Sequence, residues 1–315
     1  MVVVPKVSVI VPAYNIASYI ADTLMSVETQ TFRDFEVLVI DDGSTDDTAK
    51  QVKIFCRRDD RFQLLQKDNG GLASARNYGM RHARGEYIAL LDGDDLYKPN
   101  KLANHVARLD RNAEAGVVYS ASAAIRDDGG STFISLSGRP LSNNLLFSLL
   151  CKNFIGHGSN AVFRRCIVED VGGFDETLPS AEDIDYWLRI AATGKWTFDR
   201  EPQVLCCYRV RPSGLSFNVA EMQRCGERVI KGAYQRSPDL VEPMLPTASA
   251  YMYRYLARLS ITSSDRIKAR EYIDLAWKSD RSIFLRDLRS LLTLVSVRLA
   301  PIAQIVIRQS LGSSK

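Results

Sequence analysis

The segment that most constrains this chain covers residues 85–100, where a short apolar run is followed at once by carboxylates. Residues 87–91 are apolar and rich in β-forming side chains, which predicts a buried strand. Asp92, Asp94 and Asp95 then crowd its carboxyl end. Like charges so close repel one another unless a cation lies between them. A divalent cation with oxygen ligands is the usual solution, although a solvated acidic turn has the same pattern.

The first hundred residues alternate apolar runs with helical patterns, and this alternation is typical of a parallel sheet with helices on both faces. Ligands bind such sheets at the carboxyl ends of the strands. Strands are expected at residues 7–11, 35–40, 62–65 and 87–91, and helices at 17–30, 46–56 and 72–83, with another beginning near Asn100. Polar residues follow three of these strands, at Pro12 to Asn15, Asp41-Asp42 and Asp92 to Asp95, so we expect them to meet at one edge.

Composition places few further limits on the class of protein. The chain has 315 residues, 46% hydrophobic and 25% charged, which fits one large domain or a domain with an appendage. A net charge of +4 gives no reason to expect nucleic acid as a partner. Six cysteines without a C-x-x-C pair, together with three histidines, argue against a zinc site and favour reduced, buried thiols in a cytosolic protein. The apolar amino terminus is too short for a membrane span and lacks a signal-peptide pattern.

Two common phosphate-binding motifs are absent from the sequence. No G-x-G-x-x-G follows the first expected strand, and no G-x-x-x-x-G-K-[ST] occurs. Phosphates would therefore be held in another way, by a metal ion and by side chains near Lys67 and Arg76.

Five segments, taken in order, resemble family 2 glycosyltransferases. They are VSVIVPAYN, DDGSTDDT, QKDNGGLASARNYG, GEYIALLDGDD and SAEDIDYWLR, and the similarity covers about residues 5–215. It implies a GT-A-type α/β fold with a mostly parallel, Rossmann-like sheet, helices on both faces and a helical carboxyl-terminal extension. The catalytic domain would cover residues 1–217, with a nucleotide-sugar-binding half at 1–100 and an acceptor-side half at 101–217, and the helical region would cover 218–315.

The resemblance assigns a nucleotide-diphosphate sugar to the first half of the sheet. Asp41 or Asp42 would accept a hydrogen bond from the base, which suits the N3–H group of uracil or thymine; one of them could instead cap the following helix. Gly71 would allow close approach of the ligand, and Arg76 would contact a phosphate unless it is a surface arginine. Pro12, Ala13, Tyr14 and Asn15 would line the base and ribose pocket.

Asp92-Gly93-Asp94 matches the D-x-D motif of this family. By that resemblance Asp94 would ligate Mg²⁺ or Mn²⁺, and Asp92 would contact the ribose or the water shell of the metal. Asp95 would lie outside the ligand set. Many relatives have a histidine where this chain has Tyr208 to Arg211, so Arg209 or Arg211 would contact the diphosphate instead, which leaves the full metal ligand set open.

The segment Ser180 to Trp187 matches the family segment that carries the general base. By that resemblance Asp183 would deprotonate the acceptor hydroxyl, and Glu182 would lie on the acceptor side. A helix amino terminus would help to keep both acids ionised, although acids also favour that position for simple capping. Trp187 is expected in the core beneath the site, or stacked on an acceptor sugar. No Q-x-x-R-W follows Trp187, which argues against the processive synthases.

Residues 218–278 are expected to be helical, with breaks near Pro238, Pro243 and Pro246. Residues 281–315 combine basic and apolar side chains, but Arg298 and Pro301 interrupt any apolar span of about 20 residues. This segment would lie on a membrane surface as a basic amphipathic helix or pack on the catalytic domain. The predicted location is the cytoplasm, at the inner face of the plasma membrane if the segment binds lipid.

The sequence thus predicts an inverting, non-processive hexosyl- or N-acetylhexosaminyltransferase. It would move a sugar from a nucleotide-diphosphate donor, with UDP-sugars favoured, to a glycan or lipid-linked acceptor in cell-surface polysaccharide biosynthesis. A sugar-phosphate nucleotidyltransferase and a non-catalytic nucleotide-sugar-binding scaffold are the alternatives. The sugar, the linkage and the oligomeric state stay open.

Overall fold

The computed structural model describes residues 4–211 and 218–299, which fall into two compact units. Unit 1 comprises residues 1–149 and 153–212, and unit 2 comprises residues 150–152 and 213–315. Unit 1 holds the sheet and unit 2 is helical. Each is described by itself below.

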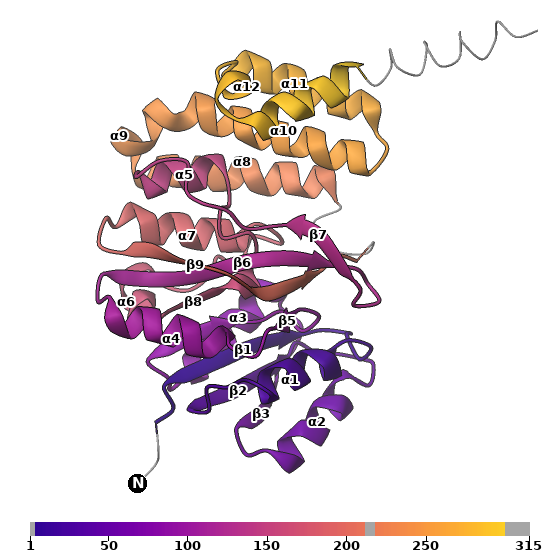
Figure 1. Cartoon of the computed structure of the whole chain (residues 1–315), viewed down its shortest axis with the longest axis vertical. Helices are drawn as coiled ribbons and strands as arrows, with labels where there is room; N and C mark the ends of the chain where they lie inside the picture. The colour runs from indigo at the N-terminus through magenta and orange to yellow at the C-terminus, as the bar shows by residue number, and fades with distance from the viewer. Residues whose placement is uncertain (1–3, 212–217, 300–315) are drawn as a thin grey trace, which may run out of the picture. The chain divides into compact units, whose positions relative to one another are not determined.

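The amino-terminal half of the sheet has the expected alternation of strands and helices (Figure 1). Four neighbouring strands, in the order β3-β2-β1-β4, pair in parallel. Every side chain of β1 and β2 is buried, as expected for central strands covered on both faces. The elements are β1 (Val7–Ala13), α1 (Ile20–Glu28), β2 (Phe35–Asp41), α2 (Thr48–Arg58), β3 (Phe62–Gln66), α3 (Leu72–His82) and β4 (Tyr87–Leu90).

The second half of the sheet is mixed rather than parallel. The full order is β3-β2-β1-β4-β8-β6-β9-β5, with β7 paired to β6. β8 runs antiparallel to both β4 and β6, because a long connection after β6 brings the chain back in the opposite direction. The strands are β5 (Leu96–Tyr97), β6 (Ala115–Ile125), β7 (Ser131–Ser135), β8 (Ala161–Arg164) and β9 (Thr197–Arg209). β6 and β9 pair in parallel, whereas β5 runs antiparallel to β9. The sheet is therefore mostly parallel, as predicted, with antiparallel pairs confined to its second half.

The remaining helical elements of the sheet region include α7 (Glu182–Ala192), which carries the predicted Glu-Asp pair. Trp187 and Tyr186 on this helix are fully buried against Phe163 and Phe174. The prediction that Trp187 belongs to the core is confirmed. The other elements are α4 (Lys101–Arg111), α5 (Leu145–Cys151), η1 (Gly158–Asn160) and α6 (Ile167–Val171).

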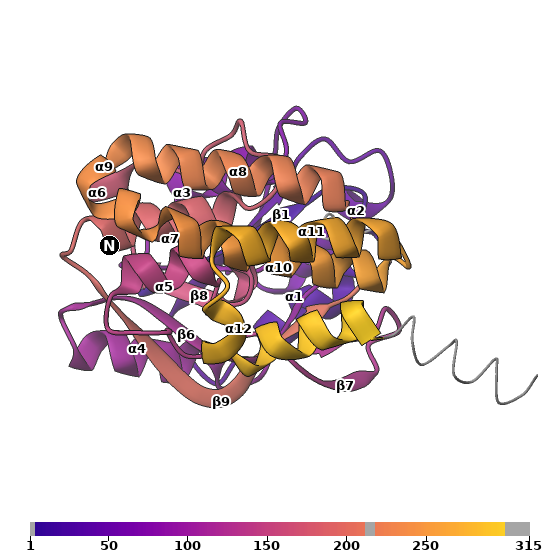
Figure 2. The same cartoon turned by 90° about the horizontal axis from the view of Figure 1, so that it is seen from above.

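Unit 2 is helical, as the sequence predicts. Its helices α8, α10 and α11 lie side by side (Figure 2), and Pro238 occupies the first turn of α9. No helix within residues 4–211 and 218–299 is long and apolar enough to cross a bilayer. The elements are α8 (Val219–Arg236), α9 (Pro238–Val241), η3 (Glu242–Met244), α10 (Leu245–Thr262), α11 (Arg266–Ser279) and α12 (Ile283–Arg286), followed by helical residues 288–299. The predicted basic segment beyond residue 299 lies outside the described residues.

All six cysteines lie within the described residues, and none forms a disulfide. Cys151, Cys206, Cys207 and Cys225 are buried, as expected. Cys56 is half-buried and Cys166 is exposed, so burial does not hold for every thiol.

Candidate active site

The carboxyl ends of β1 and β2 are tied together by hydrogen bonds between their loops. The Thr45 amide donates to Asn15 Oδ1 at 2.8 Å, and the Ala17 amide donates to Asp46 Oδ2 at 3.0 Å. Asn15 has a positive φ of 48°, a conformation that asparagine tolerates better than most residues. Tyr14 stays 50% exposed above this junction. The site therefore presents an aromatic ring at the end of β1.

The carboxylates of Asp41 and Asp42 are buried and hydrogen-bonded within the chain. Asp41 accepts from the Ser44 amide and from Gln66 Nε2. Asp42 accepts from Lys67 Nζ at 2.6 Å and from the amides of Gly70 and Gly71 at 3.0 and 2.8 Å. Asp42 thus orders the loop that leads into α3.

Gly71 and Gly93 are glycines for different physical reasons. Gly71 has a φ of +87°, and a Cβ there would meet nothing within 4 Å. Gly71 therefore borders open space in a conformation that favours glycine. A Cβ on Gly93 would lie 2.1 Å from Ile16 Cδ1 and 3.0 Å from the Pro12 carbonyl oxygen, so glycine lets the Asp92–Asp94 turn lie close to the end of β1.

Asp95 is fully buried and holds the turn after β4 in place. Its carboxylate accepts from Ser159 Oγ at 2.5 Å and from the Arg209 amide at 2.9 Å. Ser159 Oγ in turn accepts from the Asp92 amide at 3.0 Å. Burial, and then the charges of Asp94 and Asp92, raise the pKa of Asp95 well above its usual range. Asp95 is thus placed to organise this turn from within the core.

Arg76 joins the two acidic segments of the site. Its side chain is 1% exposed. Nη2 donates to Asp92 Oδ1 at 2.7 Å, and Nη1 donates to Glu182 Oε1 at 2.5 Å. A single guanidinium therefore brings the end of β4 and the start of α7 together, although the two segments are about ninety residues apart in sequence.

Glu182 and Asp183 are the first residues of α7, directly after a residue with a strained backbone. Ala181 has φ +59° and ψ 17°, a left-handed conformation that costs a non-glycine residue of order 1 kcal/mol. Asp183 Oδ2 accepts from Asn153 Nδ2 at 3.2 Å, and Oδ1 accepts from the Ile184 amide at 2.8 Å. Burial raises the pKa of the Glu182 carboxyl to about 7, while Arg76 opposes this shift and Asp183 adds to it. Burial also raises the pKa of Asp183, and Arg76 again opposes it.

Arg209 and Arg211 approach the acidic cluster from the end of β9 and have different surroundings. Arg209 is 4% exposed and donates to the backbone carbonyls of Asp94 and Asp127 at 2.8 and 2.6 Å. Arg211 is more open, with Nε 2.7 Å from Asp94 Oδ2, and its guanidinium lies over the Tyr19 ring. Arg211 is therefore the better placed of the two to meet a ligand, and Arg209 anchors the turn.

The composition of this cluster fits a divalent cation. Asp92, Asp94, Asp95, Glu182 and Asp183 bring five carboxylates against the three guanidinium groups of Arg76, Arg209 and Arg211. No group of three or more acid, histidine or cysteine side chains in residues 4–211 and 218–299 forms a metal cage. Mg²⁺ commonly binds through one or two carboxylates and substrate phosphates, so Asp92 and Asp94 fit that role.

A family model described as "Glycosyl transferase family 2" matches residues 8–172, which is just over half of the chain. The chain belongs to this glycosyltransferase family. An uncharacterized glycosyltransferase of Rickettsia typhi is 32% identical over 202 residues, 62% of each chain. The hyaluronan synthase of Pasteurella multocida is 31% identical over 193 residues, which is 61% of this chain and 19% of that one. The match covers only 29% of a relative from Rickettsia bellii.

Solved structures agree on the fold, which is of the GT-A type. The mannosyltransferase PcManGT from Pyrobaculum calidifontis, in complex with GDP-Man and Mn²⁺, has a TM-score of 0.61 at 22% identity. That match covers 94% of this chain and 88% of the other. S. aureus TarS 1–349, in complex with UDP-GlcNAc, has a TM-score of 0.56 at 20% identity and covers 88% and 91%. The predicted glycosyltransferase family and fold class are confirmed.

The glycosyltransferase fold gathers the predicted site residues into two adjoining groups. Asp92, Asp94, Arg76, Glu182 and Asp183 form the acidic cluster with Arg209 and Arg211, and Pro12 to Asn15 adjoin Asp41 and Asp42. Arg76 lies between two carboxylates rather than on the surface. Its Nε has no hydrogen-bond partner among the described residues, but the side chain is 1% exposed, so the predicted phosphate contact would require neighbouring side chains to move.

The sequence did not predict the buried hydrogen-bond network that Lys101 forms beneath the site. Lys101 is fully buried and donates to Asn160 Oδ1 and to the Asn160 carbonyl at 3.0 and 2.6 Å. Asn160 Nδ2 donates to the Ser120 carbonyl at 2.8 Å. These contacts hold the strand end next to Ser159 beneath Asp92 and Asp95. Lys101 is the first residue of α4. A lysine at such a position is ordinarily expected on the surface, so the sequence carried no signal for this network.

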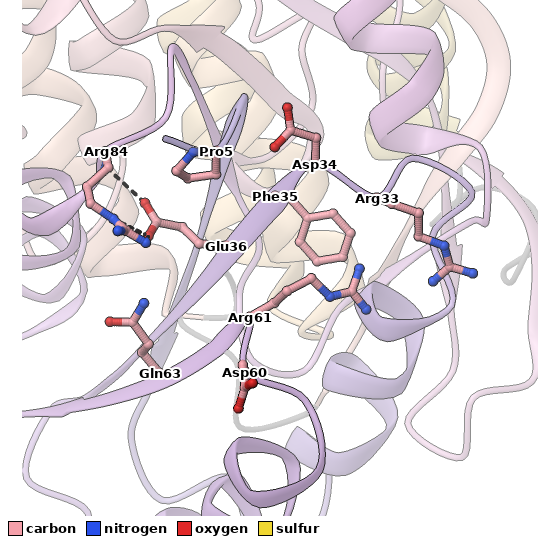
Figure 3. Close-up of a pocket in the computed structure, with 9 residues that line it drawn as sticks. All are labelled: Pro5, Arg33, Asp34, Phe35, Glu36, Asp60, Arg61, Gln63 and Arg84. Carbon is pink, nitrogen blue, oxygen red and sulfur yellow. Dashed lines mark hydrogen bonds and ion pairs between the residues drawn. The ribbon is translucent and has the colours of Figure 1, made fainter. Parts of the chain in front are cut away.

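A hollow of about 280 Å³ lies at the amino ends of β1, β2 and β3, opposite the strand ends that carry the acidic cluster (Figure 3). Its arginines already have partners. Arg84 donates to Glu36 Oε2 at 2.7 and 2.9 Å, and Arg61 pairs with Asp59 and lies over the Phe35 ring. Three arginines and three acids line this hollow, so its formal charges balance without a ligand.

Proposed function

We propose that this chain is an inverting glycosyltransferase that takes a nucleotide-diphosphate sugar as donor. The observation that carries the proposal is the bridge of Arg76 between Asp92 and Glu182. The bridge places the carboxylates of the Asp92-Gly93-Asp94 turn next to those at the start of α7. A glycosyl transfer needs such an arrangement, because the donor and the acceptor must meet between the two groups.

Asp183 is proposed as the general base. In an inverting transfer the acceptor hydroxyl attacks the anomeric carbon, its proton passes to the base, and the nucleoside diphosphate leaves from the opposite face. Asn153 and the Ile184 amide hold the Asp183 carboxylate by hydrogen bonds, which orients it for this transfer. Its raised pKa makes it a stronger base than an exposed aspartate.

The donor is proposed to lie over the ends of β1, β2 and β4. Tyr14 would stack on the base or ribose, and the open space beside Gly71 would admit the ligand. Asp41 and Asp42 are each engaged by donors of the chain, so a base contact would use their remaining acceptor capacity. UDP-sugars are favoured, and a hexose or N-acetylhexosamine is the proposed sugar.

Asp94 is proposed to hold Mg²⁺ or Mn²⁺, with Asp92 beside it. The bound metal would stabilise the charge that develops on the leaving diphosphate. Arg211 would supply a further positive charge at the same place, since it already pairs with Asp94. The acceptor is proposed to be a glycan or a lipid-linked glycan of a cell-surface polysaccharide, and the predicted cytoplasmic location belongs to the same proposal.

A calorimetric screen of UDP, GDP, dTDP and CDP, each with and without Mn²⁺, tests the donor site. We expect one nucleotide to bind in a metal-dependent way, and Asp94→Asn to weaken that binding at least tenfold. Asp239→Asn, on α9 of unit 2, is the control and should bind as the wild type does. A folded protein that binds none of the four nucleotides would contradict the proposal.

Asp183→Asn tests the base separately from the donor site. We expect transfer to an added acceptor to fall by a factor of about 10² to 10⁴, the usual contribution of a general base, while nucleotide binding stays unchanged. Glu169→Gln, an exposed acid on α6, is the matched control. Undiminished transfer by Asp183→Asn would show that another residue is the base.

A further inference from the structure

The helical segment 288–299 of unit 2 turns an apolar face to solvent. We call Leu288, Leu291, Leu292, Val295 and Leu299 the leucine stripe; their exposed fractions are 68%, 40%, 55%, 40% and 52%. Their spacing places them on one face of a helix. The opposite face carries Ser290, Thr293 and Val297, which are buried.

This arrangement is the reverse of an ordinary surface helix, which turns its apolar side inward. Leu285, just upstream in α12, extends the apolar surface and is 90% exposed. Contiguous exposed apolar side chains on a soluble protein generally mark a contact with another molecule or with a membrane. The leucine stripe is therefore a candidate contact surface.

Positive charges flank the leucine stripe. Arg289 and Arg298 lie about 100° from the stripe on either side, because successive residues of a helix are 100° apart, and Arg281 and Arg286 precede it and are exposed. Arg298 is paired with Asp274. Asp287 is the single acid in residues 281–299, and its carboxylate accepts from the Ser290 amide and hydroxyl at 3.1 and 2.6 Å. That acid therefore caps the helix that carries the stripe.

A basic cluster lies beside this helix within unit 2, formed by Lys152, Arg254, Arg258 and Arg289. Arg254 is 6% exposed, and its Nε has no hydrogen-bond partner among the described residues. Burial lowers the pKa of the Lys152 ammonium, and the charges of Arg289, Arg254 and Arg258 bear on it, each lowering the pKa further. Arg254 and Arg258 lie one turn apart on the same face of α10, and the charges of Arg258 and Arg289 also lower the pKa of Arg254.

The basic cluster holds more positive charge than its surroundings balance. The charge of one acid, Asp287, raises the pKa of both Lys152 and Arg254 and so opposes the effect of the cations. A buried cation is costly unless nearby charges of opposite sign compensate it, and arginine side chains commonly bind phosphate. Arg289 belongs both to this cluster and to the flank of the leucine stripe, so an anion bound here would lie next to apolar surface.

We propose that unit 2 docks on an anionic membrane surface, with the leucine stripe in the headgroup–acyl boundary and a lipid phosphate in the basic cluster. Anionic lipid supplies both chemistries at once, a phosphate and an apolar layer directly beneath it. A second copy of this chain would instead bring like-charged arginines together, which opposes association. Residues 300–315 add Arg308 and Lys315 and no acid, which increases the attraction to anionic lipid. This inference does not depend on the proposed transfer reaction.

Vesicle co-sedimentation of the full chain tests the proposal, with phosphatidylcholine vesicles compared with phosphatidylcholine–phosphatidylglycerol vesicles. We expect binding to the anionic vesicles that weakens as salt is added. Leu288→Asp combined with Leu292→Asp should reduce binding at least tenfold, because two charged groups would enter the apolar layer. Ile267→Asp is the matched control, since Ile267 is 76% exposed on α11 outside the stripe, and it should bind like the wild type.

The basic cluster is tested with Arg258→Glu against Arg270→Glu, two exposed arginines on α10 and α11. A charge near an anionic surface contributes about fivefold in binding, so Arg258→Glu should lose at least that factor and Arg270→Glu clearly less. An excess of free inorganic phosphate should not release the wild type from the vesicles, since the stripe adds contacts that free phosphate lacks.

Three results would overturn the proposal. One is a folded wild type that does not bind anionic vesicles at low salt. Another is equal binding by the stripe variant and by Ile267→Asp, which would place lipid contact elsewhere. The third is a stripe variant that changes the oligomeric state in light scattering while vesicle binding is kept, which would make the stripe an interface between copies. Circular dichroism and thermal unfolding of every variant exclude misfolding as the cause.

Discussion

Arg76 in unit 1 and Arg254 in unit 2 are both buried, at 1% and 6% exposure, but the charges around them are opposite. Burial lowers the pKa of each guanidinium. Around Arg76 the carboxylates of Asp92 and Glu182 outweigh burial and raise its pKa. Around Arg254 the pKa stays lowered. Asp287 opposes the effect of burial, but Arg258 and Arg289 add to it.

The comparison separates two uses of a buried charge. Arg76 has its partners within the chain, so it can hold Asp92 and Glu182 in position before any ligand arrives. Arg254 lies among other cations, and Asp287 opposes their effect only in part, so a bound anion would add to the compensation of its charge. A buried charge that is satisfied internally organises a site, and one that is not satisfied indicates a ligand of opposite charge.

Replacing Arg76 should have the largest effect on stability. Arg76→Met removes the partner of two buried carboxylates, and breaking a buried pair in this way costs about 3–5 kcal/mol. We expect the free energy of unfolding in urea to fall by that amount, with Arg57→Met, an exposed arginine on α2, as the control. A loss no greater than that of the control would mean that the carboxylates are protonated and that Arg76 does not hold them.

The pH dependence of stability should reveal Glu182 in the same cluster. Its pKa rises from 4.5 to about 7 on folding, so the folded state binds the extra proton between those values. Stability therefore falls as pH rises through that window. We expect the unfolding free energy of the wild type, relative to that of Glu182→Gln, to decrease as the pH rises from about 4.5 to 7. A constant difference across this range would contradict the raised pKa.

Replacing Arg254 should have the smallest effect on stability. Arg254→Met removes a buried cation that other cations repel, so the free energy of unfolding should stay within about 1 kcal/mol of the wild type or rise. Urea unfolding of Arg254→Met beside Arg270→Met checks this. A loss as large as that of Arg76→Met would show that Arg254 has a strong internal partner, and the contrast between the two units would then fail.

The local sequence was sufficient to predict the first strands and the starts of several helices. The apolar runs of β1 and β2 ended at polar residues where predicted, and α3, α4 and α7 began close to the expected positions. The second half of the sheet was harder, because β8 and β9 depend on long connections that reverse the chain and leave no periodic signal. The positions of Asp41 and Asp42 were anticipated, but their hydrogen bonds to Gln66, Lys67 and the loop of Gly71 were not.

The sequence by itself determined the family, the order of the first strands and the acids that follow them, since these depend on local patterns of apolar and charged residues. Only the tertiary structure decided which charges have partners. It placed Arg76 between two carboxylates, Lys101 beneath the site, Arg254 among cations and the leucine stripe toward solvent. The reason is physical: the energy of a buried charge depends on neighbours that are distant in sequence, and only folding brings them within reach.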